Sequence, residues 1–253
     1  MRGLTISGLL AISLGLVACD DLPGKPDPSE RYQRPDEITD FSTLYATRCA
    51  ACHGTEGTHG AARPLGDPLY LALVPLDRVR DVVARGIPGT SMPGFSQEVG
   101  GWLTDAQIDI LAKGLFTTWS RPDTVPTGPL PPYDEAASLR AGYAPGDATR
   151  GAAAYAEFCA HCHGADGRGG PDGGSVVDHN FLALVSGQML RNSVTAGRPD
   201  LGMPGWNALS DRGPMPPQAI SDVVAWLEAA RAQPGAPTPP TPPEASASPA
   251  ESL

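Results

Sequence analysis

Apolar residues recur at helical spacing in several stretches of the chain. The longest runs from Thr104 to about Thr117, and a comparable one runs from Ser221 to Arg231. Shorter amphipathic stretches cover residues 76–85 and 187–196. We find neither the strict apolar–polar alternation of a half-buried strand nor the continuous apolar runs of a parallel sheet. The pattern therefore predicts an all-α fold.

The helical pattern occurs twice, offset by about 110 residues. We call the two copies the first repeat (residues 36–119) and the second repeat (residues 146–233). In each copy we expect a first helix, a glycine-rich loop, short helices and a last helix. Thr39 or Asp40 can cap the first helix of the first repeat, and Thr149 can cap that of the second. The matching segments are Tyr45–Cys49 with Tyr155–Cys159, Cys52–Gly57 with Cys162–Gly167, and Met92–Phe95 with Met203–Trp206.

Proline separates the repeats from the rest of the chain. Of the 28 prolines, 17 lie in segments 23–35, 122–145 and 234–249. Residues 120–145 are therefore expected to form a semi-extended linker between the repeats. Residues 234–253 lack core-forming side chains and are expected to be a disordered tail. The net charge of −10, without a Lys/Arg-rich cluster, argues against nucleic acid as a partner.

Four of the five cysteines lie in two Cys-x-x-Cys-His strings: Cys49, Cys52 and His53, and Cys159, Cys162 and His163. This string is the attachment signature of c-type haem, in which both thiols bond covalently to the porphyrin and the histidine binds iron. A zinc site would need further ligands nearby, and a redox dithiol would need neither the histidine nor a duplicate. The strings therefore predict two covalently bound haem c groups.

A second iron ligand is available in each repeat. Met92 follows His53 by 39 residues, and Met203 follows His163 by 40. Each methionine lies in a Met-Pro-Gly-aromatic loop shortly before the last helix, and a thioether is a suitable ligand for haem iron. The alternative is that both are core residues. Met215 is interpreted as packing, and the histidines at 59, 161 and 179 as exposed loop residues.

On these residues the chain resembles class I cytochromes c in a tandem, di-haem form. The resemblance implies covalent attachment through Cys49, Cys52, Cys159 and Cys162, and axial ligation by His53, Met92, His163 and Met203. It further implies that the carbonyl of Pro64 accepts a hydrogen bond from the ring of His53. The second repeat departs here, because Gly174-Ser175 occupies the aligned position. Tyr45 and Tyr155 resemble the family's aromatic residue that packs the first helix on the last. The tryptophans at 102 and 206 are interpreted as packing residues, with contact to haem propionates as the alternative.

The N-terminus contains an export signal. A single charge precedes an apolar run from Leu9 to Val17, which is too short to span a membrane. Leu16-Val17-Ala18-Cys19 resembles a bacterial lipobox, so residues 1–18 are expected to be a signal peptide and Cys19 the acylated first residue. A plain signal peptide is the alternative. Residues 19–35 would then tether the protein to the periplasmic side of a membrane.

Together these features predict an electron carrier rather than an enzyme. It would pass single electrons from a membrane donor complex to a terminal oxidase or reductase, with its acidic surface steering it to basic docking faces. One alternative is a di-haem redox enzyme, a peroxidase or a sulfur-compound dehydrogenase, although a methionine matched to each haem argues against an open iron. Another is a fixed haem subunit of a larger respiratory complex.

Overall fold

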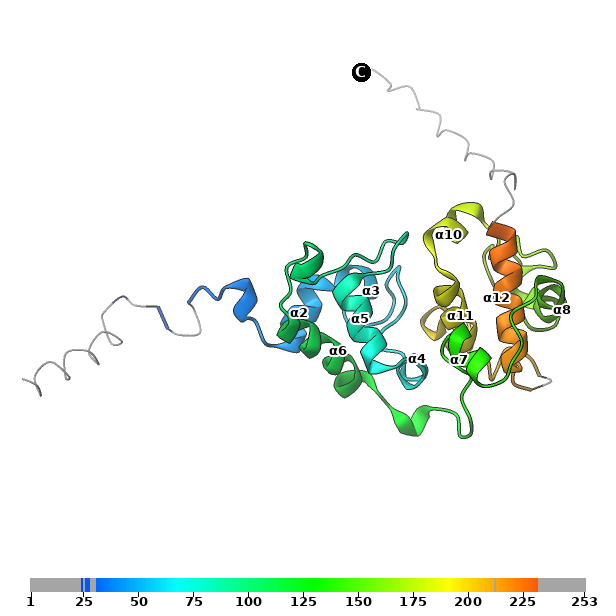
Figure 1. Cartoon of the computed structure of the whole chain (residues 1–253), viewed down its shortest axis with the longest axis horizontal. Helices are drawn as coiled ribbons and strands as arrows, with labels where there is room; N and C mark the ends of the chain where they lie inside the picture. Colours follow the sequence, from blue (N-terminus) through cyan, green and yellow to red (C-terminus); the bar gives the residue numbers. More distant parts are fainter. Residues whose placement is uncertain (1–23, 25, 28–30, 212, 232–253) are drawn as a thin grey trace, which may run out of the picture. The chain divides into compact units, whose positions relative to one another are not determined.

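The helices expected from the apolar pattern are present in a computed structural model of the chain, which describes residues 24, 26–27, 31–211 and 213–231 (Figure 1). The expected signal peptide, Cys19 and the tail at 234–253 lie outside these residues. The chain divides into two units, Met1–Ile38 and Thr39–Leu253. In the first, the 3-10 helix η2 (Pro35–Glu37) is closed by Arg34, whose side chain pairs with Glu37 at 2.6 Å.

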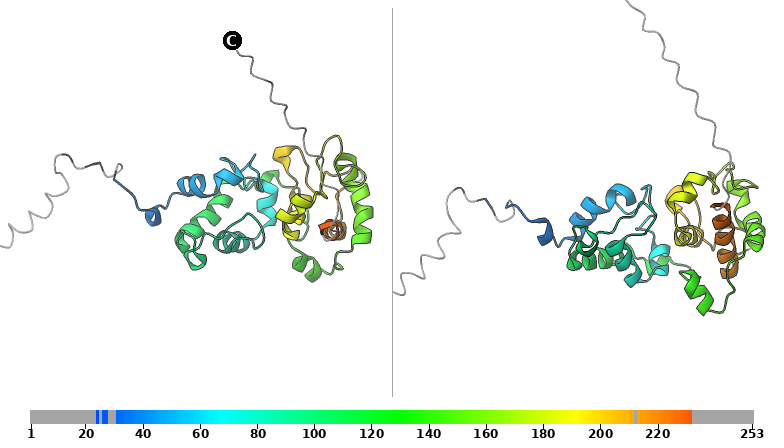
Figure 2. Two further views of the ribbon diagram at one scale, coloured as in Figure 1. Left: turned by 90° about the horizontal axis from the view of Figure 1, so that it is seen from above. Right: turned by 45° about the horizontal axis from the view of Figure 1, so that its top comes forward.

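From Thr39 onward both repeats lie in the second unit, and they follow the same order of helices (Figures 1 and 2). Apart from isolated bridges, no strand occurs in the described residues, so the fold is all-α. None of the described helices is long and apolar enough to span a bilayer. The first repeat contains α2 (Phe41–Arg48), α3 (Ala50–His53), α4 (Pro68–Leu73), α5 (Leu76–Arg85), η3 (Gln97–Val99) and α6 (Asp105–Trp119). The second contains α8 (Ala148–Phe158), α9 (Ala160–His163), α10 (His179–Leu184), α11 (Gly187–Ala196), η5 (Pro199–Leu201) and α12 (Pro217–Arg231).

Aromatic contacts join the first and last helices of each repeat, as the resemblance implied. Tyr45 on α2 meets Trp119 on α6 edge to face, with ring centroids 4.9 Å apart. Tyr155 on α8 stacks on Trp226 of α12 at 4.3 Å. The tyrosine hydroxyls donate to the carbonyls of Gly54 and Gly164, at 2.9 and 2.6 Å. Each tyrosine therefore ties the helix pair to the end of the Cys-x-x-Cys-His turn.

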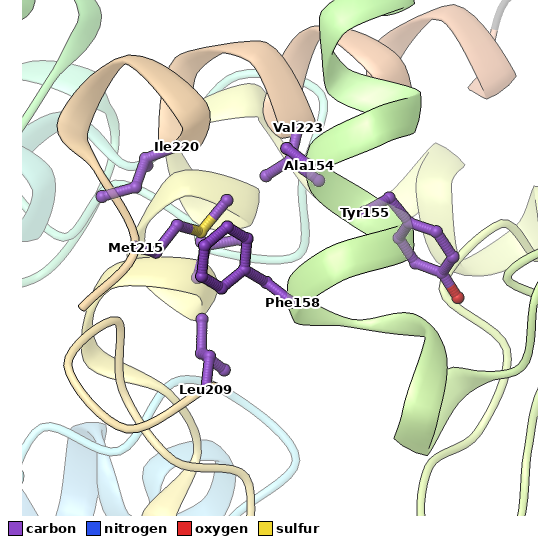
Figure 3. Packing of buried hydrophobic residues seen from close by; sticks show 8 residues of the cluster. Ala154, Tyr155, Phe158, Leu209, Met215, Ile220 and Val223 are labelled. Atoms are coloured by element: carbon purple, nitrogen blue, oxygen red, sulfur yellow. The ribbon is translucent and has the colours of Figure 1, made fainter. Parts of the chain in front are cut away.

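The core of the second repeat packs between α8 and α12 (Figure 3). The thioether of Met215 lies beside the ring of Phe158, and Met215 is completely buried, which confirms its interpretation as a packing residue. Ile220 and Val223 complete the apolar face of α12. The first repeat buries an equivalent set on α2, on α6 and just before α6: Leu44, Leu103, Ile108, Leu111 and Leu115.

Helix caps agree with the sequence in the first repeat and differ in the second. Asp40 caps α2 by accepting from the Thr43 amide at 2.7 Å, and Thr104 caps α6. In the second repeat Asp147, not Thr149, caps α8, because its carboxylate accepts from the Arg150 amide at 2.8 Å. The expected last helix begins at Pro217, four residues before Ser221.

The segment between the repeats is more ordered than its proline content indicated. It contains η4 (Pro122–Thr124) and α7 (Glu135–Arg140), and α7 contacts α12. Arg191 on α11 has a buried guanidinium that donates to the Ser138 hydroxyl at 2.7 Å and to Glu135 at 3.2 Å. A buried charge with these partners holds α7 against the second repeat. The expectation of a purely semi-extended linker was therefore wrong at α7.

Candidate functional site

The two Cys-x-x-Cys-His strings adopt the same conformation. In the first repeat, the amides of Cys52 and His53 donate to the Cys49 carbonyl at 3.2 and 3.0 Å. In the second repeat, the amides of Cys162 and His163 donate to the Cys159 carbonyl at the same two distances. Both thiols and the histidine of each string therefore lie on one helical turn, as a haem attachment site requires. None of the four string cysteines forms a disulfide. Burial raises the pKa of Cys49 to about 11 and that of Cys159 to about 12.

A backbone carbonyl orients the ring of His53. Its Nδ1 lies 2.7 Å from the carbonyl oxygen of Arg63, so Nδ1 donates and Nε2 is left to bind a metal. Burial lowers the pKa of His53, which favours the neutral, ligating form. The expected acceptor, the carbonyl of Pro64, is wrong by one residue. Pro64 is fully buried directly after the acceptor and restricts Arg63 to an extended conformation.

In the second repeat, a backbone carbonyl also accepts a hydrogen bond from the histidine ring, but no proline follows the acceptor. The Nδ1 atom of His163 lies 2.8 Å from the carbonyl oxygen of Gly174. A Cβ atom at Gly173 would lie 2.6 Å from this nitrogen, so the loop can approach the ring because position 173 is glycine. A hydrogen bond to Nδ1 is therefore present in both repeats.

Each candidate methionine lies in a closed loop that follows a helix. The Ile87 amide donates to the Met92 carbonyl at 3.0 Å, after Gly86 ends α5 with φ 71°. The Arg198 amide donates to the Met203 carbonyl at 2.9 Å, and the Met203 amide donates back at 3.0 Å. Gly197 ends α11 with φ 73°, and a Cβ there would lie 2.5 Å from the Met203 carbonyl oxygen. Both side chains are half-buried, unlike the fully buried Met215.

Unsatisfied buried donors near the strings fit a haem. Trp206, three residues after Met203, packs on the same apolar cluster as Cys159, and its indole N–H is buried without a partner in the described residues. The Nε atom of Arg48, next to Cys49, is also buried and unpartnered there. Such donors are costly unless they meet an acceptor, and haem propionates are carboxylate acceptors. The thiols, ring nitrogens and donors present therefore fit covalently attached haem.

Other sequence-based interpretations had mixed outcomes. The side chains of His59, His161 and His179 are exposed, although the last two lie on the short helices α9 and α10 rather than in loops. Trp102 is not a packing residue, because 72% of it is exposed and the Arg48 guanidinium lies 5.4 Å from its ring centroid. In the part of the chain that the structure describes, no cluster of three His, Cys, Asp or Glu side chains is arranged to hold a metal ion.

Sequence reasoning missed Arg63 and Arg48. Arg63 contributes a carbonyl to one site and a buried guanidinium to a contact with the other repeat. Its position directly before a proline in the loop after the string was the available signal, since that backbone is restricted. Nothing in the sequence marks Arg48 as different from other charged helix ends.

The family model described as "Cytochrome C oxidase, cbb3-type, subunit III" matches residues 36–113 and 146–227. The two matched segments fall on the two repeats. Each contains one Cys-x-x-Cys-His string and one methionine loop.

Three curated relatives match parts of the chain. Cytochrome c55X of Paracoccus denitrificans is 33% identical over 100 residues, which are 38% of this chain and 89% of that protein. The cbb3-type cytochrome c oxidase subunit FixP of Bradyrhizobium sp. is 28% identical over 179 residues, 67% of this chain and 54% of that subunit. Dihydro-heme d1 dehydrogenase of Pseudomonas aeruginosa is 37% identical over 73 residues, 29% of this chain and 14% of that enzyme. The match thus spans about half the length of FixP and a small part of the dehydrogenase.

Proposed function

We propose that this chain, which belongs to the cbb3-type oxidase subunit III family of c-type cytochromes, is a di-haem electron carrier with His/Met ligation in both repeats. As a member of that family, the chain is a haem c electron-transfer cytochrome. One haem c would be attached to Cys49 and Cys52, with His53 and Met92 as axial ligands. The other would be attached to Cys159 and Cys162, with His163 and Met203 as ligands.

The observation that carries this proposal is the duplicated ligand arrangement. In both repeats a backbone carbonyl accepts from Nδ1 of the string histidine, and a glycine-ended helix leads into a hydrogen-bonded methionine loop. Ligands held in this way need little rearrangement when an electron arrives or leaves. An enzyme that binds substrate at iron would instead need an open or displaceable position on one haem.

The residues of the chain have distinct roles in this mechanism. When bound, haem supplies a one-electron iron couple. The cysteines fix its position, and the hydrogen bonds from His53 and His163 to the carbonyls of Arg63 and Gly174 set the tautomer and basicity of each imidazole. The methionine loops would hold the thioethers of Met92 and Met203 as the second iron ligands.

The partners and the location of the protein are part of the proposal. Similarity to FixP, named as an oxidase subunit, supports a respiratory redox partner, with a membrane donor complex on one side and a terminal oxidase or reductase on the other. The net charge of −10 favours basic docking faces and salt-sensitive encounters. We place the protein on the periplasmic side of a bacterial membrane, anchored through a lipid on Cys19.

Two alternatives have specific support. The resemblance to dihydro-heme d1 dehydrogenase favours a catalytic role, but the matched segment is 14% of that enzyme and is compatible with a shared cytochrome c domain. The match to the subunit III family favours a fixed place in an oxidase complex. A fixed subunit would keep the same haem ligands and electron-transfer role.

Reductive titration of the haem-loaded full chain tests the carrier function. A carrier takes up one electron per haem reversibly, and its visible spectrum keeps the features of six-coordinate iron throughout. It also shows no turnover with hydrogen peroxide or reduced sulfur compounds. Steady-state turnover of either substrate would favour the enzyme alternative, and isolation with oxidase subunits in mild detergent would favour the fixed subunit.

A further inference from the structure

A buried arginine of the first repeat is hydrogen-bonded to the second repeat. Arg63 is 6% exposed, and its Nη1 and Nη2 atoms both donate to the carbonyl oxygen of Gly197 at 2.9 Å. Nη1 also lies 3.3 Å from the carbonyl of Asn192. Because guanidinium donors form a planar fork, one side chain can hold the end of α11 through several hydrogen bonds.

Two further neighbours of this guanidinium belong to the first repeat. The Tyr70 ring centroid lies 4.9 Å from it, and a buried carboxylate oxygen of Asp67 lies 3.8 Å away. Tyr70 and Asp67 belong to α4 and its N-cap, and α4 contacts α11. Burying a charge is costly, so its bonds to the other repeat offset part of that cost and make the contact specific.

The backbone carbonyl and the guanidinium of Arg63 contact different candidate haem sites. Its carbonyl oxygen accepts from Nδ1 of His53, the string histidine of the first repeat. Its guanidinium binds Gly197, where the loop that carries Met203 begins. That loop is short and closed, because Arg198 and Met203 exchange backbone hydrogen bonds at 2.9 and 3.0 Å. Movement of Gly197 would therefore displace Met203.

A second set of contacts holds the same loop. The Arg198 guanidinium donates to the Gly60 carbonyl at 3.0 Å, and the His59 amide donates to the Asp200 carboxylate at 3.0 Å. Arg198 and Asp200 also pair with each other at 2.9 Å, and the Asp200 side chain is 2% exposed. The loop after the first string thus binds the methionine loop of the second repeat at three places: Gly60, His59 and Arg63.

We propose that Arg63 is a positioning residue for both haem sites. Its carbonyl oxygen orients the imidazole of His53, while its guanidinium holds the Gly197–Met203 loop so that Met203 remains an iron ligand of the second repeat. The inference rests on the proposed ligand role of Met203. It implies that a substitution in the first repeat opens the haem of the second repeat and leaves its own repeat's haem closed.

Carbon monoxide binding to the ferrous, haem-loaded full chain tests this assignment, because CO binds iron when the sixth ligand is absent or mobile. In Arg63→Met the backbone carbonyl is retained and the guanidinium is lost, so we expect CO to bind at up to one haem per chain, whereas the wild-type protein binds none. The matched control is Arg121→Met, which removes an exposed guanidinium that donates to the carbonyls of Thr118 and Ser120. This control should bind CO as wild type does.

A double variant identifies which haem opens. Met203→Ala alone should bind one CO per chain, and Arg63→Met combined with Met203→Ala should still bind one. Binding of a second CO by the double variant would mean that the first repeat's haem had opened, which would overturn the proposal. An Arg63→Met protein as inert to CO as wild type would overturn it too.

A milder variant covers the case in which Arg63→Met yields no haem-loaded protein. Arg63→Lys keeps the charge and loses the planar fork, so its CO-reactive fraction should lie between those of wild type and Met203→Ala. A CO-inert Arg63→Lys protein would then contradict the role of Arg63. Wild-type protein that itself binds CO would instead contradict the proposed ligation, so the two failures are distinguishable.

Discussion

The imidazole of His163 lies against the backbone of Gly173, so closely that a Cβ atom at position 173 would be 2.6 Å from Nδ1 and 2.7 Å from Cε1. The next residue, Gly174, supplies the carbonyl that accepts from Nδ1. In the first repeat, the residue before a buried proline supplies it instead. Two different loop sequences therefore provide the same hydrogen bond to the candidate proximal histidine.

Gly173→Ala should alter the haem of the second repeat, because the added methyl group displaces the ring of His163 and weakens its hydrogen bond. A less polarised imidazole stabilises ferric iron less well, so the midpoint potential should rise, by about 40 mV if the bond contributes ~1 kcal/mol to a one-electron couple. Spectroelectrochemical titration measures this shift. Gly174→Ala is the matched control, since a Cβ there meets nothing within 4 Å. Equal potentials in the two variants would show that the contact has no such effect.

Met92→Ala and Met203→Ala should each keep covalently bound haem and open one iron to CO, with a lower midpoint potential at that haem. Met215→Leu provides the control, because Met215 is fully buried in the core of the second repeat. That volume-conserving exchange should lower the free energy of unfolding by less than about 1.5 kcal/mol and leave the haem spectra unchanged. CO binding by the Met215→Leu protein, or its absence in both alanine variants, would contradict the ligand assignment.

Asp222 should make the second repeat sensitive to acid. Burial alone would raise the pKa of Asp222, but hydrogen bonds from Arg150, Asp147 and Gln218 outweigh it and place the pKa below its ordinary value. Its contribution to stability is therefore complete above the unfolded-state pKa of about 4 and is lost as the pH falls through the lower folded-state value.

Asp222→Asn should lower the free energy of unfolding at pH 7 by about 1–2 kcal/mol, since Arg150 is half exposed and its pairing is partly screened. The variant should lose less stability than wild type as the pH falls below 4. Denaturant unfolding followed across this pH range measures both effects. Asp109→Asn, at the exposed pair with Arg80, should change little. If both variants behave alike, the Arg150–Asp222 pair between α8 and α12 has no special role.

The parts of the fold predicted correctly have strong local signals. Helices α5 and α11 begin and end where the sequence placed them, because Pro75 and Ser186 precede them and Gly86 and Gly197 follow. The strings and the methionine loops are predicted from spacing, which depends on residues close together in the chain and on the duplication. The tyrosine contacts are expected from the resemblance to class I cytochromes c and join helices far apart in the chain.

The features that were missed depend on tertiary contacts or on the backbone. Helix α7 is six residues long in a proline-rich segment and is held by Arg191 from a distant helix. The acceptors for His53 and His163 are backbone carbonyls, which carry no residue-type signal. The bond from Arg63 to Gly197 joins residues 134 positions apart, beyond any local pattern.

The central claim is that both irons are ligated by histidine and methionine. A CO difference spectrum of the reduced, haem-quantified wild-type protein tests it most directly. The account predicts a covalent haem at each Cys-x-x-Cys-His string and no CO response from either. A CO-binding haem in the wild-type protein would contradict the account and favour a catalytic site at that iron.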